Sequence, residues 1–288
     1  MKHKYELDES LQSLYKIHTP FSKVLFPPAN LFLRLFSLRP GSGIVVRRYT
    51  LSGLPVLDVA PEGASADVPI LIYLHGGAFV YRAAPYHYKL VREYALSGCR
   101  ILMPDYSLSP ENRYPAAVLE TVALYRWARE NLSASVALGG DSAGGEIALS
   151  ATLRIIEDGM EVPQFLMLIY PVVDNVMTES KRRFTDTPVW SSVLNEKMWR
   201  LYLGKEKYRS VLESPLLSSF PPAYIETPVI DALHDEALML AGKLGGKDVS
   251  VVCHDVPSAP HGYDMILSSP LVKESIEARK NYIISRLC

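Results

Sequence analysis

The chain has 288 residues, 48% of them hydrophobic and 21% charged, which is enough to bury a large core in one domain that carries an insertion. A formal net charge of −1 and the lack of a basic run give no electrostatic basis for binding nucleic acid. Three widely spaced cysteines without a CxxC pair, Cys99, Cys253 and Cys288, argue against a disulfide framework or a thiolate metal site. We expect them to be reduced, two in strands and one at the chain end.

The first ten residues, MKHKYELDES, lack the apolar core and small-residue cleavage site of a signal peptide, so we expect a cytoplasmic protein. The apolar patch NLFLRLFSL, Asn30 to Leu38, is too short to span a bilayer and contains Arg34. We expect this patch to cover a neighbouring apolar pocket; resting on a membrane surface is the less favoured alternative. Stable membrane insertion is not expected.

Strand-like and helix-like segments alternate after Gly43. GIVVRRYTL (43–51) and PVLDVAP (55–61) indicate an antiparallel pair, and VPILIYLHGG (68–77) and CRILMPDYS (99–107) are typical of buried strands. Helical spacing of apolar residues follows at 116–131. Further on we predict strands at 134–140, 163–173, 221–230 and 249–256 and helices at 143–158, 235–244 and 268–287. This alternation predicts an α/β fold, with a mostly parallel central sheet and helices on both faces.

One region interrupts the alternation. Residues 174–215 contain no strand-like run but do contain the helix-like SSVLNEKMWRLYL, which predicts a small helical cap inserted between units of the sheet. Residues 1–40 are the candidate partner of that cap. The predicted division is therefore a cap-forming segment at 1–40 and a catalytic domain at 41–288 with its cap insertion at about 174–215.

The sequence HGGAF, residues 75–79, ends the first buried strand. Consecutive glycines allow the N–H groups of Gly76 and Gly77 to point into one cavity, as an oxyanion hole requires. The N–H of Ala143, the residue after the candidate nucleophile, would be the third donor. His75 belongs to the strand that delivers the glycines, so we expect it to order the loop by hydrogen bonding and not to act as a base.

The sequence GDSAG, residues 140–144, lies between a predicted strand and a predicted helix. A sharp turn there would lift the Ser142 hydroxyl above the sheet, and small neighbours let the backbone approach closely. The turn would also place this hydroxyl at a helix N-terminus, which favours negative charge. Ser142 is therefore the candidate nucleophile.

Seven histidines compete to be the base that a serine nucleophile needs. His3 and His18 precede the sheet, His87 and His234 fall in helix-like segments, and His254 lies inside a strand. His261 lies in SAPHGYD, just beyond the last strand, where functional loops of an open parallel sheet are found. We therefore take His261 as the base.

The orienting carboxylate should lie on another such loop. Asp231 directly follows a predicted strand, and it falls between serine and histidine in chain order. Asp105 also ends a strand and is the rival, although we expect it to hold the following loop. Asp141 is next to Ser142 in sequence, so we expect its side chain to point in the wrong direction to reach the imidazole. Asp235 and Glu236 are typical of the first turn of a helix.

Together these motifs resemble the hormone-sensitive-lipase-like family of α/β-hydrolases, a group of carboxylesterases. The resemblance rests on five motifs in family order, which cover roughly residues 68–264: HGGAF (75–79), DYSLSPENRYPAA (105–117), GDSAGG (140–145), DALHDE (231–236) and HGY (261–263). It implies that Ser142, Asp231 and His261 form a catalytic triad and that Gly76, Gly77 and Ala143 form the oxyanion hole. Four positions depart from the family: Ala78 replaces its third glycine, Tyr263 its phenylalanine, and Pro228 and Val229 its Ala-Glu.

The expected function is hydrolysis of short-chain acyl esters through an acyl-enzyme, with no metal or organic cofactor. An amidase or acylpeptide hydrolase on the same scaffold remains open, as does, less favoured, a non-catalytic binding protein. The expected partner is a small acyl ester; the resemblance allows a homodimer. Aromatic residues could line an apolar cleft, although we expect most of them to be packing residues: Phe79, Tyr81, Trp190, Trp199, Tyr202 and Tyr263.

Overall fold

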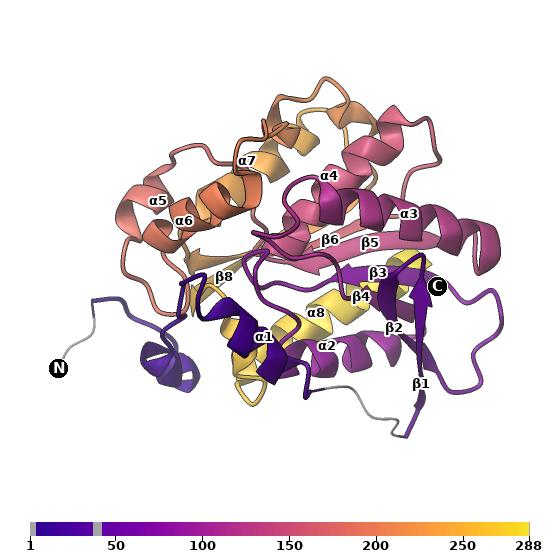
Figure 1. Ribbon diagram of the computed structural model, residues 1–288, viewed down its shortest axis with the longest axis horizontal. Coiled ribbons are helices and arrows are strands. Elements are labelled where there is room, and N and C mark those ends of the chain that lie inside the picture. Colours follow the sequence, from indigo (N-terminus) through magenta and orange to yellow (C-terminus); the bar gives the residue numbers. More distant parts are fainter. Residues whose placement is uncertain (1–3, 37–41, 288) are drawn as a thin grey trace.

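The computed structural model describes residues 4–36 and 42–287, which form an eight-stranded sheet between two layers of helices (Figure 1). The strand order is β1-β2-β4-β3-β5-β6-β7-β8. The strands are β1 Ile44–Leu51, β2 Leu54–Pro61, β3 Ile70–Leu74, β4 Arg100–Pro104, β5 Val136–Asp141, β6 Leu166–Ile169, β7 Ala223–Ile230 and β8 Val251–Pro260.

The sheet is antiparallel only at one edge. β1 pairs with β2 and β2 with β4 in antiparallel register, whereas β4, β3, β5, β6, β7 and β8 run parallel. The central strands β3, β5 and β6 are buried along their whole length, as their continuous apolar sequences predicted. The predicted α/β-hydrolase fold is therefore confirmed.

The helices cover both faces of the sheet. In Figure 1, α3, α4 and α7 lie on one side of the strands, and α2 and α8 lie on the other. Alternate residues of a strand enter the two cores, so Ile72 packs with α3 and α4 while Leu71 packs with α2 and α8. The α-helices are α1 Phe26–Leu33, α2 Pro85–Ala95, α3 Ala116–Asn131, α4 Ala143–Glu157, α5 Glu179–Arg183, α6 Ser192–Leu203, α7 His234–Gly245 and α8 Pro270–Leu287.

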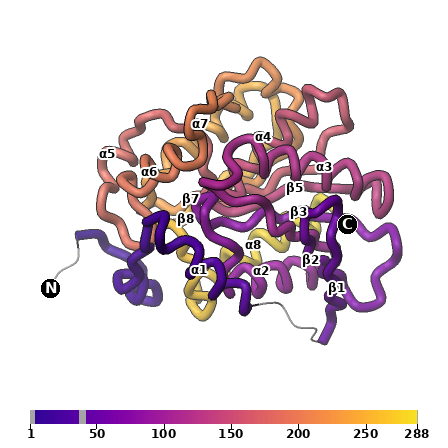
Figure 2. The backbone as a smooth tube through the Cα atoms, viewed as in Figure 1, coloured from indigo at the N-terminus to yellow at the C-terminus, as the bar shows by residue number. Residues whose placement is uncertain are grey.

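Short 3₁₀ segments complete the set at Glu9–Lys16, Val211–Glu213, Leu217–Ser219 and Tyr263–Met265. Residues 174–215 contain the helices α5 and α6, which lie beside the N-terminal segment in the tube view as well (Figure 2). Thr19 donates to the Val189 carbonyl at 2.7 Å, and the rings of Phe21 and Trp190 lie 5.8 Å apart. These contacts hold the two segments together over one end of the sheet.

Three expectations about local structure need correction. The last strand runs to Pro260, four residues beyond its predicted end. Cys99 is buried just before β4 and not inside it, whereas Cys253 lies in β8; Cys288 is outside the described residues.

The third correction concerns the patch at 30–38, whose last two residues are not described. Leu33 and Asn30 face the body of the protein, but Leu31, Phe32 and Leu35 are exposed, so the patch covers a pocket only in part. No helix among the described residues is long and apolar enough to cross a membrane.

Candidate active site

The residues that directly follow the parallel strands lie together at one edge of the sheet. Ser142 follows β5, Asp231 follows β7 and His261 follows β8. His75 follows β3 and Asp105 follows β4 at the same edge. This edge is where the topology of an open parallel sheet places binding sites.

The turn at Ser142 is strained and tightly enclosed. Ser142 adopts φ 52° and ψ −118°, a conformation that is costly for a residue with a side chain. A Cβ atom on Gly144 would lie 1.9 Å from the Leu74 carbonyl oxygen, and one on Gly140 would lie 2.5 Å from it. Only glycine fits at these two positions, because β3 and the start of α4 approach each other so closely.

The three predicted residues form one continuous hydrogen-bond chain. His261 Nε2 lies 2.9 Å from Ser142 Oγ, and His261 Nδ1 lies 2.6 Å from Asp231 Oδ2. The other Asp231 oxygen accepts from the Leu233 N–H at 2.9 Å, which fixes the carboxylate plane. All three side chains are buried, so their hydrogen bonds are shielded from bulk water. This is the arrangement that activates a serine for attack on a carbonyl carbon.

The HGG loop lies against the same serine turn. Gly77 adopts φ 132°, and a Cβ there would lie 2.5 Å from the Tyr81 carbonyl oxygen. A Cβ on Gly76 would lie 2.3 Å from Asp141 Oδ2, so this carboxylate packs directly against the glycine. Within the described residues, the N–H groups of Gly77 and Ala78 donate to no protein acceptor. The loop therefore presents two N–H groups that a ligand oxygen can use.

Asp141, next to Ser142, anchors this loop, and its side-chain hydrogen bonds within the described residues do not include His261. Its carboxylate accepts from the Tyr73 hydroxyl at 2.9 Å and faces His87 Nε2 at 3.1 Å. Because the Ala84 N–H donates to His87 Nδ1, the proton of a neutral His87 lies on Nε2. Burial alone would raise the pKa of Asp141, but His87, Tyr73 and the Gly76 N–H hold it below its usual value.

A cavity of about 170 Å³ opens over the serine. Its wall includes Ser142, His261, Gly76, Gly77 and Ala78. The remaining wall is mostly apolar and includes Leu33, Tyr81, Tyr86, Val189, Trp190 and Met265. Ser142, His261 and the HGG loop therefore face one small, mainly apolar space.

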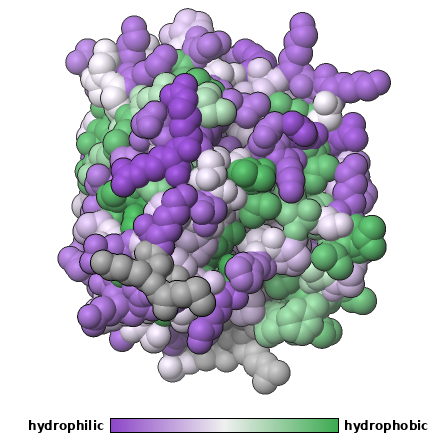
Figure 3. All heavy atoms as spheres, turned by 90° about the vertical axis from the view of Figure 1, so that its left-hand side faces the viewer, coloured by the Kyte–Doolittle hydropathy of each residue, from purple (hydrophilic) through white to green (hydrophobic). Residues whose placement is uncertain are grey.

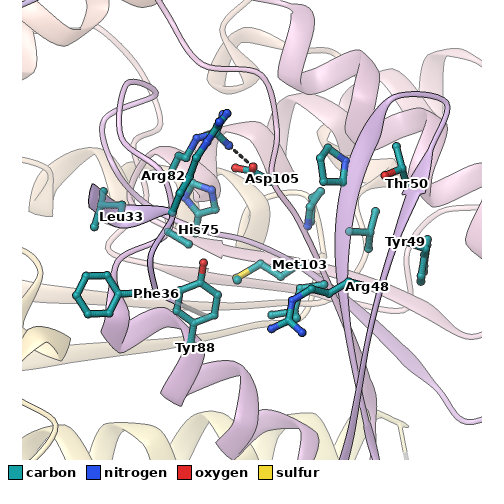
Figure 4. A pocket seen from close by; sticks show the side chains of 16 residues that line it. Leu33, Phe36, Arg48, Tyr49, Thr50, His75, Arg82, Tyr88, Met103 and Asp105 are labelled. Carbon is teal, nitrogen blue, oxygen red and sulfur yellow. Dashed lines mark ion pairs between the residues drawn. The ribbon is translucent and has the colours of Figure 1, made fainter. Parts of the chain in front are cut away.

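A second cavity of about 350 Å³ adjoins the first and shares Leu33 and Arg82 with it (Figure 4). Arg82 forms an ion pair there with Asp105, the rival candidate for the acid. Asp105 is thus engaged away from His261, and it is Asp231 that contacts the imidazole.

His75 also lines this second cavity and does not reach Ser142 in any described contact. Its Nδ1 lies 2.7 Å from the Gly76 carbonyl oxygen, and its ring stacks on Tyr106 at 4.4 Å. Burial, together with the nearby His87, lowers the pKa of His75 to about 3, so the ring is neutral at pH 7. These contacts match the loop-ordering role expected for it.

Most of the predicted cleft aromatics are core residues. Phe79 stacks on Tyr202 at 3.6 Å, and Trp199 is almost fully buried beside them. Of the six, Tyr81 and Trp190 line the cavity over the serine.

A buried charge network behind His261 escaped the sequence interpretation. Arg279 of α8 donates to Glu226 of β7 at 2.5 Å and to Asp264 at 2.9 Å, and all three are fully buried. The hydroxyl of Tyr263 donates to Glu226. Three positions after His261, Asp264 also accepts from Tyr170, whose ring lies 4.8 Å from the imidazole. The only sequence signal was the tyrosine in HGY.

Among the described residues, no group of three or more His, Cys, Asp or Glu side chains could hold a metal ion.

Comparison with known proteins agrees with the fold and identifies the family. The family described as the alpha/beta hydrolase fold matches residues 71–265. Esterase LipI of Mycobacterium tuberculosis is 30% identical over 268 residues, covering 79% of this chain and 83% of that protein. Carboxylesterase NlhH of the same species is 28% identical, covering 74% of this chain and 72% of that protein. A solved esterase of the bacterial hormone-sensitive lipase family superposes with a TM-score of 0.86 at 27% identity, over 100% of both chains.

Proposed function

Since this chain belongs to the hormone-sensitive-lipase-like family of alpha/beta hydrolases and is a carboxylic ester hydrolase, we propose that it cleaves short-chain acyl esters through Ser142, His261 and Asp231. The observation that carries the proposal is the unbroken chain of contacts from Asp231 to His261 to Ser142.

In the first half-reaction His261 Nε2 accepts the proton of Ser142 as the serine oxygen attacks the ester carbonyl carbon. Asp231 accepts a hydrogen bond from Nδ1, which keeps Nε2 free to take the proton and stabilises the imidazolium that forms. The imidazolium then protonates the departing alcohol, which leaves an acyl group on Ser142. Water attacks this acyl-enzyme by the same route and releases the acid.

The oxyanion that forms during each attack requires N–H donors. Ala143 begins α4, where the first N–H groups have no intrahelical partner. On the HGG loop, the N–H groups of Gly76, Gly77 and Ala78 donate to no backbone carbonyl among the described residues. We therefore propose that Gly76, Gly77 and Ala143 form the hole, as expected from the sequence, with the N–H of Ala78 beside them.

The preference for short acyl groups follows from the size of the site. The cavity over Ser142 measures about 170 Å³, whereas sites for drug-sized ligands measure roughly 300–1,000 Å³. The N-terminal segment and the 174–215 insertion, which we propose to form a cap, supply Leu33, Val189 and Trp190 to its wall. We expect p-nitrophenyl acetate and butyrate to be hydrolysed faster than the palmitate; faster turnover of the palmitate would contradict the assignment.

Substitution of the nucleophile tests the mechanism itself. Ser142→Ala should lower kcat by roughly 10⁴-fold to 10⁶-fold and abolish covalent labelling by an organophosphate. Rapid labelling of the unsubstituted chain would also eliminate a non-catalytic binding protein. Anilides with matched acyl groups should react more slowly than the esters; equal or faster cleavage would favour an amidase.

A further inference from the structure

The N-terminal segment around α1 carries a concentrated apolar surface that its own packing does not use. Val24 is 81% exposed, Leu31 67%, Phe32 59% and Leu35 76%. Leu25 and Phe36 are exposed as well, and the Phe32 and Phe36 rings pack against each other at 5.2 Å. Figure 3 views the side of the molecule that carries this segment, and hydrophobic surface gathers along one edge of it. We call these six residues the α1 patch.

The opposite face of α1 is firmly attached to the protein. Phe26 is buried between Phe21 and Tyr81, each ring centroid 5.4 Å away. Asn30 donates to the Val80 carbonyl at 2.8 Å and accepts from the Arg82 N–H at 2.9 Å. These contacts fix the rotation of the helix, so the α1 patch points outward in the folded state. Contiguous exposed apolar surface of this kind typically marks an interaction site.

The charge of the sequence segment that carries the α1 patch indicates the kind of partner, although in space Asp105 and Glu111 also line a hollow beside Leu31 and Arg34. The chain has no aspartate or glutamate between residues 10 and 57, although its overall net charge is −1. The same stretch contains six basic residues: Lys16, Lys23, Arg34, Arg39, Arg47 and Arg48. Exposed Lys23 and Arg34 flank α1 directly. Apolar side chains framed by basic ones match a lipid surface with anionic headgroups.

The patch also adjoins the opening of the active site. Leu33, which belongs to α1, lines the cavity over Ser142. Arg34 lines the neighbouring cavity with Arg48 and with the ion pair of Arg82 and Asp105. A lipid surface bound to the α1 patch would therefore hold the opening of the cavity close to the layer in which apolar esters dissolve.

We propose that the α1 patch binds an anionic lipid surface, with α1 lying in the interface and not crossing it. This inference rests on the proposed function in one respect: binding to lipid would bring the active site to esters that are dissolved in the lipid. A second copy of the chain is the competing occupant of the patch.

Sedimentation with vesicles tests the proposal on the full chain. We expect the Ser142→Ala protein to bind vesicles of phosphatidylcholine and phosphatidylglycerol at least tenfold more tightly than vesicles of phosphatidylcholine alone. The triple variant Val24→Ser, Phe32→Ser, Leu35→Ser should lose at least tenfold in binding. Lys23→Gln and Arg34→Gln should each lose about fivefold, and only with anionic vesicles.

The matched control replaces three exposed apolar residues on other elements: Leu119→Ser, Val252→Ser and Ile284→Ser, which are 47%, 44% and 43% exposed. It should bind vesicles like the parent, and circular dichroism should show both triple variants folded. Equal loss in the control, or no vesicle binding by the parent, overturns the proposal. So does analytical ultracentrifugation that shows a dimer abolished by the patch variant, because the patch is then an interface between copies.

Hydrolysis of soluble p-nitrophenyl acetate by the unsubstituted chain separates the two proposals. A chain that binds vesicles but hydrolyses no ester refutes the proposed function and leaves the lipid surface standing. A chain that hydrolyses the ester but does not bind vesicles refutes the lipid surface and leaves the proposed function standing.

Discussion

At the scale of single residues, the serine turn depends on the missing side chain of Gly144. Its Cβ would overlap the Leu74 carbonyl oxygen at 1.9 Å, and neither β3 nor the start of α4 can move without displacing the HGG loop or Ser142. We expect Gly144→Ala to lower the free energy of unfolding by about 3 kcal/mol or more and to abolish esterase activity. Urea denaturation and turnover of p-nitrophenyl acetate measure the two effects.

Gly242→Ala is the matched control, because Gly242 also lies in a helix but nothing stands within 4 Å of its Cβ position. There alanine should be neutral or stabilise the protein by up to about 1 kcal/mol, since it favours the helix more than glycine does. Similar losses in the two variants would show that close packing at the serine turn is not what requires glycine.

At the scale of elements, β7, α8 and the His261 loop are joined through Arg279. Burial alone would raise the pKa of Glu226, but Arg279 and the neighbouring donors hold it at about 2, so this carboxylate is charged and paired. Arg279→Met would leave Glu226 and Asp264 buried without their cation. We expect it to cost about 3–5 kcal/mol of stability, measured by urea denaturation.

The same substitution should lower kcat more than it changes KM for p-nitrophenyl acetate, because Asp264 and Tyr263 hold the loop that carries His261. Arg286→Met serves as the control, since Arg286 is exposed on the same helix. An Arg279→Met protein with normal stability, or with kcat intact, would refute this role of the network.

The elements and the grouping of the three candidate catalytic side chains were predictable for one reason. In a parallel sheet all strands end at the same edge, so residues that directly follow β5, β7 and β8 must meet even though they are far apart in sequence. The continuous apolar run of β5 showed where that strand ends, whereas the end of β8 was predicted four residues too early. Ser142, Asp231 and His261 could therefore be brought together without coordinates.

The sequence could not show which way each side chain points at that edge of the sheet. Gly76 and Gly77 look equivalent as glycines, but only the fold reveals that Gly76 packs against the Asp141 carboxylate and Gly77 against the Tyr81 carbonyl. Asp105 and Asp231 both follow strands, and the ion pair with Arg82 separates their roles. The exposure of Phe32 was unpredictable for the same reason, since an apolar helix has no polar stripe to indicate its outer face.

At the scale of the whole molecule, buried titratable groups make stability depend on pH in opposing ways. Burial raises the pKa of Glu146 and of Glu236 to about 7, so each carboxyl takes up a proton on folding. Their contribution is full below pH 4.5 and is lost as pH rises through about 7. His75, whose pKa is lowered to about 3 in the folded chain, has the opposite effect on stability. Below pH 6.5 the unfolded chain binds this proton and the folded chain does not, so the contribution of His75 to stability falls as pH falls.

Glu146→Gln isolates one of these contributions. The Glu146 carboxylate accepts from Ser150 at 2.5 Å and Tyr202 at 2.6 Å, and in the described part of the chain no cation pairs with it. Gln keeps the shape and carries no charge, so the variant should match the parent near pH 4.5 and exceed its stability above pH 7, by on the order of 3 kcal/mol. Urea denaturation at half-unit steps of pH measures the divergence, with Glu157→Gln at the exposed end of the same helix as the control. Parallel curves for the parent and Glu146→Gln would mean that Glu146 is already ionised at neutral pH and that burial does not govern its proton.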